Sequence, residues 1–153
     1  VAKVVEKVYD CFVIRSAELY LNKAEAEAML DKAEAKQTIK TLLNNRFEGG
    51  IPDVDGLNEK DLISFIRDER RRELCFEAHR WFDLRRYAVS SKYPEKKSIR
   101  HETYDKNGVL EGDYVLKPYG EDPAWVLPIP GYEIVYNQGN LVDNPQRVER
   151  KLE

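Results

Sequence analysis

Charged and large apolar residues interleave over residues 67–86, and this pattern constrains the fold more than any other feature of the sequence. Glu73 and Glu77 alternate with residues such as Phe76 and Trp81, so on a helix some charges must share the buried side. A buried charge requires a partner and full hydrogen bonding, and arginine with carboxylate supplies both. The segment therefore predicts a semi-buried ion network that fixes how a helix docks.

The residues of the predicted ion network are expected to have a structural and not a catalytic role. They are Arg70, Glu73, Glu77, Arg80, Asp83 and Arg85. On one continuous helix Glu77 faces Arg80, and Arg80 in turn faces Asp83. A solvated charged face is the alternative, but exposed pairs contribute only about 0.2–0.5 kcal/mol each. Stability alone would not require so many of them.

Helical spacing of apolar residues predicts three helices, at about 12–30, 32–46 and 59–87. The first lacks Gly and Pro entirely, and the loop 48–56 before the third is dense in turn formers. Because the junction between the first two helices is nearly absent, they are expected to form an antiparallel hairpin of the tetratricopeptide type. The sequence contains one such hairpin, so there is no second copy against which an internal repeat could be tested.

Residues 88–153 are predicted to be irregular, since aromatics mix there with charges and turn formers. Asn107-Gly108 indicates a short β-hairpin, and the prolines within 125–130 exclude a helix or a central strand. Leu152-Glu153 resembles a cloning scar. The expected fold is mainly α, a helical hairpin plus a long third helix with an irregular C-terminal half, in a single domain over 1–153.

Charge and cysteine content exclude several classes of function. The chain has 25 basic and 28 acidic residues, so no net field attracts nucleic acid or anionic lipid. Cys11 and Cys75 form no disulfide framework and match no zinc spacing, which predicts two small buried side chains. The sequence has neither a membrane-spanning run nor a signal peptide. We expect the chain to begin inside a longer protein or to be cytoplasmic.

The sequence predicts no enzyme, no metal and no cofactor. Glu73 and Glu77 lie one helical turn apart, but the surrounding arginines would keep both ionised, whereas a glycosidase needs one protonated acid. His79 and His101 have no metal-ligand spacing with each other or with cysteine. Phosphate loops, nucleophile elbows and Cys-x-x-Cys motifs are absent from the sequence.

Aromatic residues are concentrated in the irregular half, where side chains are less committed to helix packing. Tyr104, Tyr119 and Trp125 are the candidates for ligand binding, because flat rings with a polar tip suit the faces of sugars. The alternative is that these rings cover the helices as part of the core. The sequence leaves both interpretations open.

Three separated stretches resemble the C-terminal signature of SusD/RagB proteins in order and spacing. Residues 14–26 read IRSAELYLNKAEA, residues 66–86 read IRDERRRELCFEAHRWFDLRR, and residues 127–130 read LPIP, followed by Glu133-Ile134 and Asn144-Pro145. The middle stretch is highly specific. The resemblance covers nearly the whole chain and implies a mainly helical fold built on tetratricopeptide-like helix pairs.

The resemblance also implies a function: a non-catalytic, glycan- or nutrient-binding component of an outer-membrane uptake system, of which this chain is the C-terminal scaffold portion. Such proteins sit at the cell surface, lipid-anchored through an N-terminal segment absent from this chain, over a SusC-like TonB-dependent transporter. Their glycan contacts come largely from segments that would precede Val1, so no binding residues are carried over. The alternative is a helical-hairpin adaptor that binds a protein partner, which would require several repeats.

Overall fold

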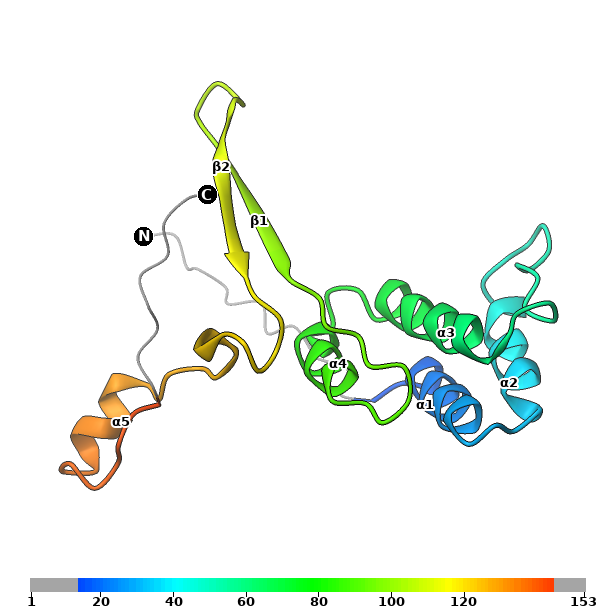
Figure 1. Ribbon diagram of the computed structural model, residues 1–153, viewed down its shortest axis with the longest axis horizontal. Coiled ribbons are helices and arrows are strands. Elements are labelled where there is room, and N and C mark those ends of the chain that lie inside the picture. The colour runs from blue at the N-terminus through cyan, green and yellow to red at the C-terminus, as the bar shows by residue number, and fades with distance from the viewer. Residues whose placement is uncertain (1–13, 145–153) are drawn as a thin grey trace, which may run out of the picture. The chain divides into compact units, whose positions relative to one another are not determined.

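The computed structural model describes residues 14–144, and the chain divides into two compact units, one up to Arg80 and one from Trp81 onward. Figure 1 shows the order of the elements along the chain. These are α1 (Ser16–Met29), α2 (Glu34–Asn44), α3 (Glu59–Glu73), α4 (His79–Ala88), β1 (Ile99–Tyr104), β2 (Leu110–Leu116), η1 (Pro123–Trp125) and α5 (Gly131–Tyr136). The predicted fold class, mainly helical with a small β-hairpin, is confirmed. The assignment of the chain to a single domain stays a prediction.

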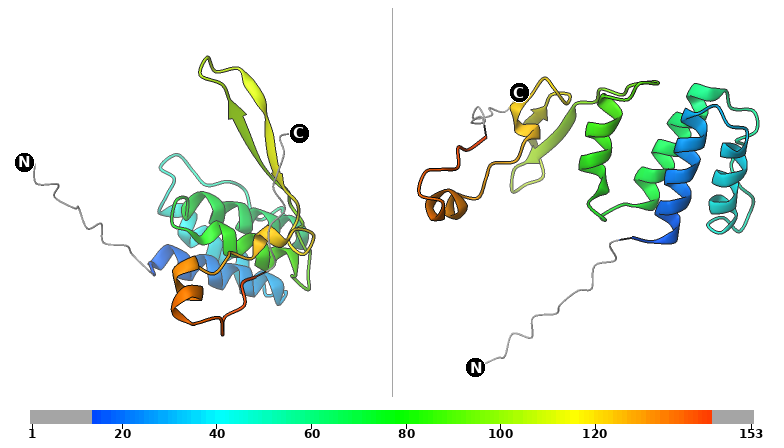
Figure 2. Two further views of the ribbon diagram at one scale, coloured as in Figure 1. Left: turned by 90° about the vertical axis from the view of Figure 1, so that its left-hand side faces the viewer. Right: turned by 90° about the horizontal axis from the view of Figure 1, so that it is seen from below.

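The helices α1, α2 and α3 form the core of the first unit and lie side by side (Figure 2). The buried face of α1 carries alanines at helical spacing together with Leu21, so neighbouring helices can approach closely. Leu21, Ile39 and Leu43 are fully buried, and each contributes about 1.5–3 kcal/mol through removal from water. The predicted helical hairpin over 12–30 and 32–46 corresponds to α1 and α2, with residues 12 and 13 outside the described part of the chain.

The loop between α2 and α3 is fixed by side chains rather than by regular structure. Lys36 donates hydrogen bonds to the backbone oxygens of Asp55 at 2.6 Å and Leu57 at 2.9 Å, and Val54 is fully buried beside them. Asn58 then caps α3 by accepting a hydrogen bond from the backbone N–H of Asp61 at 3.0 Å. The start of α3 is therefore held in place.

The predicted single helix over 59–87 is wrong, because the turn 74–78 separates α3 from α4. The residues between them contain neither Gly nor Pro, yet Phe76 and Ala78 take positive φ values of 64° and 63°. Left-handed backbone costs a non-glycine residue about 1–2 kcal/mol, so tertiary contacts must impose this turn. The burial predicted for Cys75 is also wrong, since the turn exposes it, whereas Cys11 lies outside the described residues.

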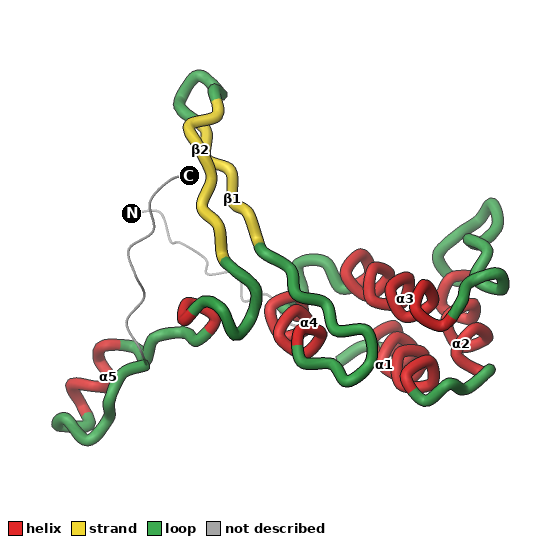
Figure 3. Tube along the Cα trace, viewed as in Figure 1, coloured by secondary structure: helices red, strands yellow, loops and turns green. Residues whose placement is uncertain are grey.

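The second unit contains the β-hairpin that Asn107-Gly108 predicted (Figure 3). The strands β1 and β2 pair antiparallel from Ile99 opposite Leu116 to Tyr104 opposite Leu110. Asp105 closes the turn, as its carboxylate accepts hydrogen bonds from the backbone N–H groups of Asn107 and Val109, both at 2.8 Å. These donors, that of Val109 foremost, lower the pKa of Asp105.

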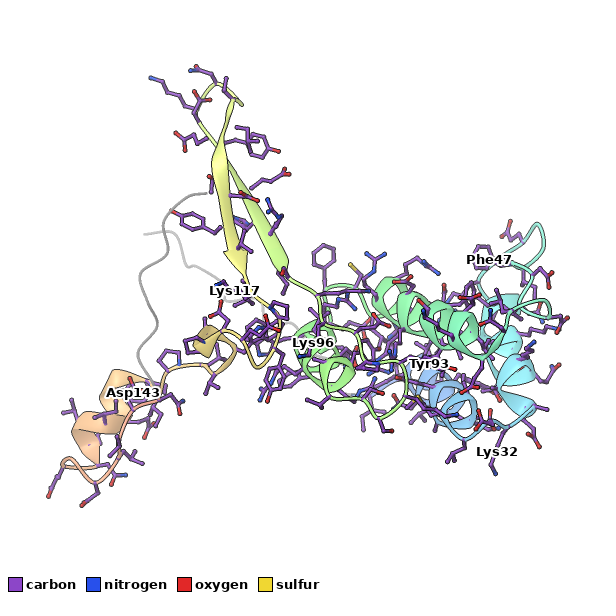
Figure 4. All side chains as sticks on the ribbon, viewed as in Figure 1. Lys32, Phe47, Tyr93, Lys96, Lys117 and Asp143 are labelled. Atoms are coloured by element: carbon purple, nitrogen blue, oxygen red, sulfur yellow. The ribbon has the colours of Figure 1, made fainter. Side chains whose placement is uncertain are left out.

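After the hairpin the chain forms η1, an extended stretch and α5, in which no residue is buried. The terminal loop, residues 127–144, closes on itself through its two ends. Asp143 accepts a hydrogen bond from the backbone N–H of Ile129 at 2.9 Å, and the Asn144 side chain donates to the backbone oxygen of Leu127 at 2.6 Å. Figure 4 shows Asp143 at the base of this loop.

Candidate functional site

Arg15, which immediately precedes α1, is a polar group with several partners in the first unit. Its Nη1 lies 2.6 Å from a carboxylate oxygen of Glu73, and its Nε and Nη2 lie 2.9 and 2.8 Å from the two carboxylate oxygens of Glu77. Nη2 also donates to the backbone oxygen of Glu73. Arg15 therefore binds both ends of the turn 74–78.

Arg46, just beyond α2, completes what we call the Arg15 cluster: Arg15, Arg46, Glu73 and Glu77. Its Nε and Nη2 donate to the two carboxylate oxygens of Glu73 at 2.9 and 2.7 Å, in the bidentate geometry that arginine favours. The Glu73 side chain is 10% exposed, while both arginines reach solvent. One carboxylate at the end of α3 thus connects three separate segments of the chain.

The electrostatics of the cluster keep its carboxylates ionised. Hydrogen bonds from Arg46 and then from Arg15 lower the pKa of Glu73, although partial burial acts in the opposite direction. A hydrogen bond from Arg15 likewise lowers the pKa of Glu77. Hydrogen bonds to Glu77 and then to Glu73 raise the pKa of the Arg15 guanidinium. A pair of carboxylates with both pKa values lowered cannot supply the protonated acid that glycoside hydrolysis requires.

A second set of ion pairs lies between α1 and α3. The Nε of Arg67 is 3.4 Å from a carboxylate oxygen of Glu25, and both side chains are almost completely buried. Arg70 is also buried and donates to the side chain of Asn22 at 2.7 Å, with Glu18 3.7 Å from its guanidinium. Buried charges are thus matched by opposite charges or amide oxygens on the facing helix, as the sequence requires.

The predicted ion network is distributed over several pairings, and its structural role stays a prediction. Glu77 pairs with Arg15 instead of facing Arg80, because the turn 74–78 removes it from a continuous helix. Arg80 is half-buried, and its membership stays a prediction. Asp83 is buried and lies 3.2 Å from Arg86. Arg85 takes a different partner, since its guanidinium lies 5.2 Å from the ring centre of Tyr119.

Sequence reasoning missed Arg15, Arg46, Glu25 and Arg67 as members. Arg67 and Glu25 each sit at helical spacing from buried apolar positions of their own helix, so that signal was available for them. Arg15 and Arg46 lie just outside helix ends, and nothing in their local pattern indicates a partner far away in the chain. Such long-range pairings come only from the folded structure.

The three candidate ligand-binding aromatics have different environments. Trp125 is 1% exposed, its ring centre lies 4.4 Å from that of Trp81, and its indole N–H donates to the backbone oxygen of Lys117 at 2.7 Å. Tyr119 is half-buried and meets Trp125 edge-on at 6.0 Å. Tyr104 is 54% exposed on β1, and its hydroxyl donates to Glu102. The structure therefore brings Tyr119 and Trp125 together, and neither contacts Tyr104.

Within residues 14–144, no His, Cys, Asp or Glu side chains are grouped as a metal site would need. A helix of the length and apolarity that crossing a bilayer demands is likewise absent from this part of the chain. The geometry instead supports packing: charged clusters that join helices in the first unit, and an aromatic cluster of Trp81, Tyr119 and Trp125 in the second.

Comparison with known proteins places this geometry in a family. SusD-like protein P2 of Formosa agariphila is 28% identical over 142 residues, which cover 86% of this chain and 25% of that protein. SusD-like protein P38 of the same organism is 41% identical over 79 residues, covering 47% of this chain and 16% of that protein. The chain thus spans about a quarter or less of the length of these relatives.

Solved structures give the same result. A SusD-like protein from Bacteroides fragilis superposes with a TM-score of 0.53 at 28% identity, over 88% of this chain and 25% of that one. A SusD-like carbohydrate binding protein from Bacteroides vulgatus superposes with a TM-score of 0.51 at 25% identity, over 82% of this chain and 29% of that one. The SusD family profile matches residues 6–146, nearly the full length. The chain belongs to the SusD family.

Proposed function

We propose that this chain is the C-terminal scaffold portion of a non-catalytic, nutrient-binding protein of an outer-membrane uptake system. The observation that carries the proposal is the family match over residues 6–146, a range that includes all four residues of the Arg15 cluster. The parent protein would be lipid-anchored at the cell surface and would work with a SusC-like TonB-dependent transporter.

Oligosaccharides are the ligand class that we propose for the parent protein. One structural relative is described as a carbohydrate binding protein, and this chain covers 29% of its length. A glycan site is normally concave and assembled from several chain segments, with aromatic faces and a few oriented polar groups. A chain that spans about a quarter of its relatives would contribute only part of such a site.

The scaffold role rests on how the first unit is held together. The Arg15 cluster joins the start of α1, the end of α2 and the end of α3 through one partly buried carboxylate. Breaking these partly buried pairs would leave the Glu73 carboxylate without its partners, which is unfavourable and supports a fixed arrangement of the three helices. Rigid helical support is what a binding surface built on loops requires.

Of the three candidate aromatics, Tyr104 is the one that we propose for ligand contact. Its ring is exposed, and its hydroxyl is oriented by Glu102 on the same strand. The hydrogen bond and charge of Glu102 raise the pKa of Tyr104, so its hydroxyl stays protonated. Trp125 is packed against Trp81, and Tyr119 against Trp125, which favours supporting roles for both.

Calorimetry against a broad glycan panel tests the proposal, with the parent protein and this chain measured side by side. We expect the parent to bind an oligosaccharide and the isolated chain to bind it with a Kd of about 1 mM or weaker, roughly −4 kcal/mol. A micromolar ligand for the isolated chain, lost in Tyr104→Ala, would place the site in this C-terminal portion. A parent that binds no member of the panel would contradict the glycan assignment.

A further inference from the structure

Phe76 is the most exposed large apolar side chain in the described part of the molecule, with a relative exposure of 103%. It lies in the turn 74–78 between α3 and α4. Isolated apolar residues on a surface are common and need no explanation. Phe76 differs because its backbone is strained and its position is fixed by neighbouring ion pairs.

The backbone around Phe76 adopts conformations that side chains normally avoid. Phe76 and Ala78 both have positive φ values, 64° and 63°, and a bulky residue in this region is a genuine outlier. Strain of this kind persists only where the surrounding structure imposes it, and it is concentrated at functional positions. A relaxed helix through this point would have removed the strain.

The Arg15 cluster provides the force that holds the turn in this shape. Arg15 binds the carboxylate and backbone oxygen of Glu73 at one end of the turn and the carboxylate of Glu77 next to Phe76. Leu74 is buried and anchors the same turn from its inner side. The phenyl ring of Phe76 is therefore held outward by fixed neighbours on both sides.

We propose that Phe76 is a docking residue that inserts into an apolar pocket formed by the remainder of the longer SusD-type polypeptide. This inference rests on the proposed function, in which the present chain is one portion of a larger protein. The chain covers about a quarter of the length of its relatives, so most of the polypeptide that could cover this turn lies outside residues 14–144.

The charges around Phe76 favour an apolar pocket as the occupant. Glu77 follows Phe76 in the chain, and it is paired with Arg15 through hydrogen bonds of 2.8 and 2.9 Å. Arg72, one turn back on α3, is paired with Glu69 at 2.6 Å. Because these two pairs of charges are already matched, an apolar surface can close over the ring at little electrostatic penalty from them.

The reactivity of Cys75 can test the proposal, because its thiol is exposed and it is the residue before Phe76 in the sequence. Maleimide alkylation of Cys75, followed by mass spectrometry of its peptide, is compared between this 153-residue chain and the longer protein. We expect Cys75 to react freely in the chain and at least about tenfold more slowly in the longer protein. Phe76→Ser should restore fast alkylation in the longer protein and lower its Tm, while leaving the Tm of the 153-residue chain unchanged.

Two further variants keep the test decisive. Phe82→Ser removes another exposed phenyl ring, from the regular helix α4, and should leave the protection of Cys75 intact. If the longer Phe76→Ser protein does not fold, Phe76→Leu keeps an apolar side chain and should retain most of the protection. The pair of leucine and serine variants then reports whether an apolar contact is required.

Three results would overturn the inference. Equal alkylation in the chain and the longer protein would leave Phe76 uncovered, while the glycan proposal would be unaffected. Protection that appears in the 153-residue chain with rising concentration would assign the contact to a second copy. A reading frame without any upstream extension would remove both this inference and the proposed C-terminal role.

Discussion

The helices α1 to α3 and the segment from β1 to α5 differ in how they are stabilised. In the three helices, Leu21, Ile39 and Ile63 are fully buried and belong to a continuous apolar core. From Ile99 to Asn144, by contrast, Ala124 and Trp125 are the only buried residues. An isolated two-stranded hairpin is marginally stable in water, so we expect this second region to be less stable than the three helices.

The ion pairs of the two regions differ in the same way. The Arg15 cluster and the Arg67–Glu25 pair connect residues far apart in the sequence. In the second region, Arg100 pairs with Asp113 on the adjacent strand of the same hairpin. Long-range pairs fix how helices dock, whereas local exposed pairs contribute little to global stability.

The largest expected difference comes from equivalent leucine truncations. Leu21→Ala should lower the free energy of unfolding by about 3 kcal/mol, because it leaves a cavity in a core that is otherwise filled. Leu127→Ala should change it by less than about 0.5 kcal/mol, since that side chain is exposed. Urea denaturation of both variants measures the effect. Equal losses would show that the second region has a core of its own.

A smaller effect is expected from the Arg15 cluster. Glu73→Gln removes the charge that Arg15 and Arg46 share, and should destabilise the chain by about 2 kcal/mol. This is below the value for a fully buried pair, because both guanidiniums reach solvent. Asp68→Asn is the matched control: its pair with Arg71 is exposed and 3.7 Å long, so its loss should be nearly neutral. Equal losses of melting temperature in the two variants would contradict a stabilising role of the Arg15 cluster.

The same cluster predicts how stability depends on pH. The pKa values of Glu73 and Glu77 are lowered in the folded chain, so the unfolded chain binds protons first as the pH falls. The stabilisation is fully present above the unfolded value near 4.5 and is lost as the pH falls through the folded pKa values. Melting temperatures from pH 7 to pH 3 should therefore fall more steeply for the wild type than for Glu73→Gln/Glu77→Gln. Parallel curves would exclude a contribution from these pairs.

The smallest predicted change is a gain in stability. Ala78 has a φ of 63°, a conformation that glycine adopts without strain. Ala78→Gly should therefore stabilise the chain by about 1 kcal/mol, the lower end of the cost of left-handed backbone. Ala24→Gly, in the interior of α1, should do the opposite. A loss of stability in Ala78→Gly would mean that the turn 74–78 is not held in the strained shape.

The sequence predicted regular elements well and interruptions poorly. Helical spacing located α1 and α2, and Asn107-Gly108 located the hairpin, because these signals are local. The break at 74–78 has no Gly or Pro to announce it. It is imposed by Arg15, which lies about sixty residues earlier in the sequence.

The predictions for the candidate site residues show the same difference between local signals and long-range contacts. Charges interleaved with apolar residues predicted a semi-buried ion network, because a buried charge needs a partner. Arg70 is buried and contacts Asn22 and Glu18 of α1, while the structural role of the network stays a prediction. Which carboxylate meets which arginine depends on tertiary packing, so the pairing of Glu77 with Arg80 did not follow. Trp125 looked available for a ligand because its surroundings are irregular, yet its ring is packed against Trp81.

Hydrogen exchange on the isolated 153-residue chain tests most directly whether the helical region is a scaffold complete in itself. We expect amides in α1, α2 and α3 to exchange only through global unfolding, and those of the hairpin and the terminal loop to exchange much faster through local opening. In a longer protein the slow set should extend into the terminal loop. Exchange in the terminal loop of the isolated chain as slow as in α1 would contradict the claim that the helices alone form the stable scaffold.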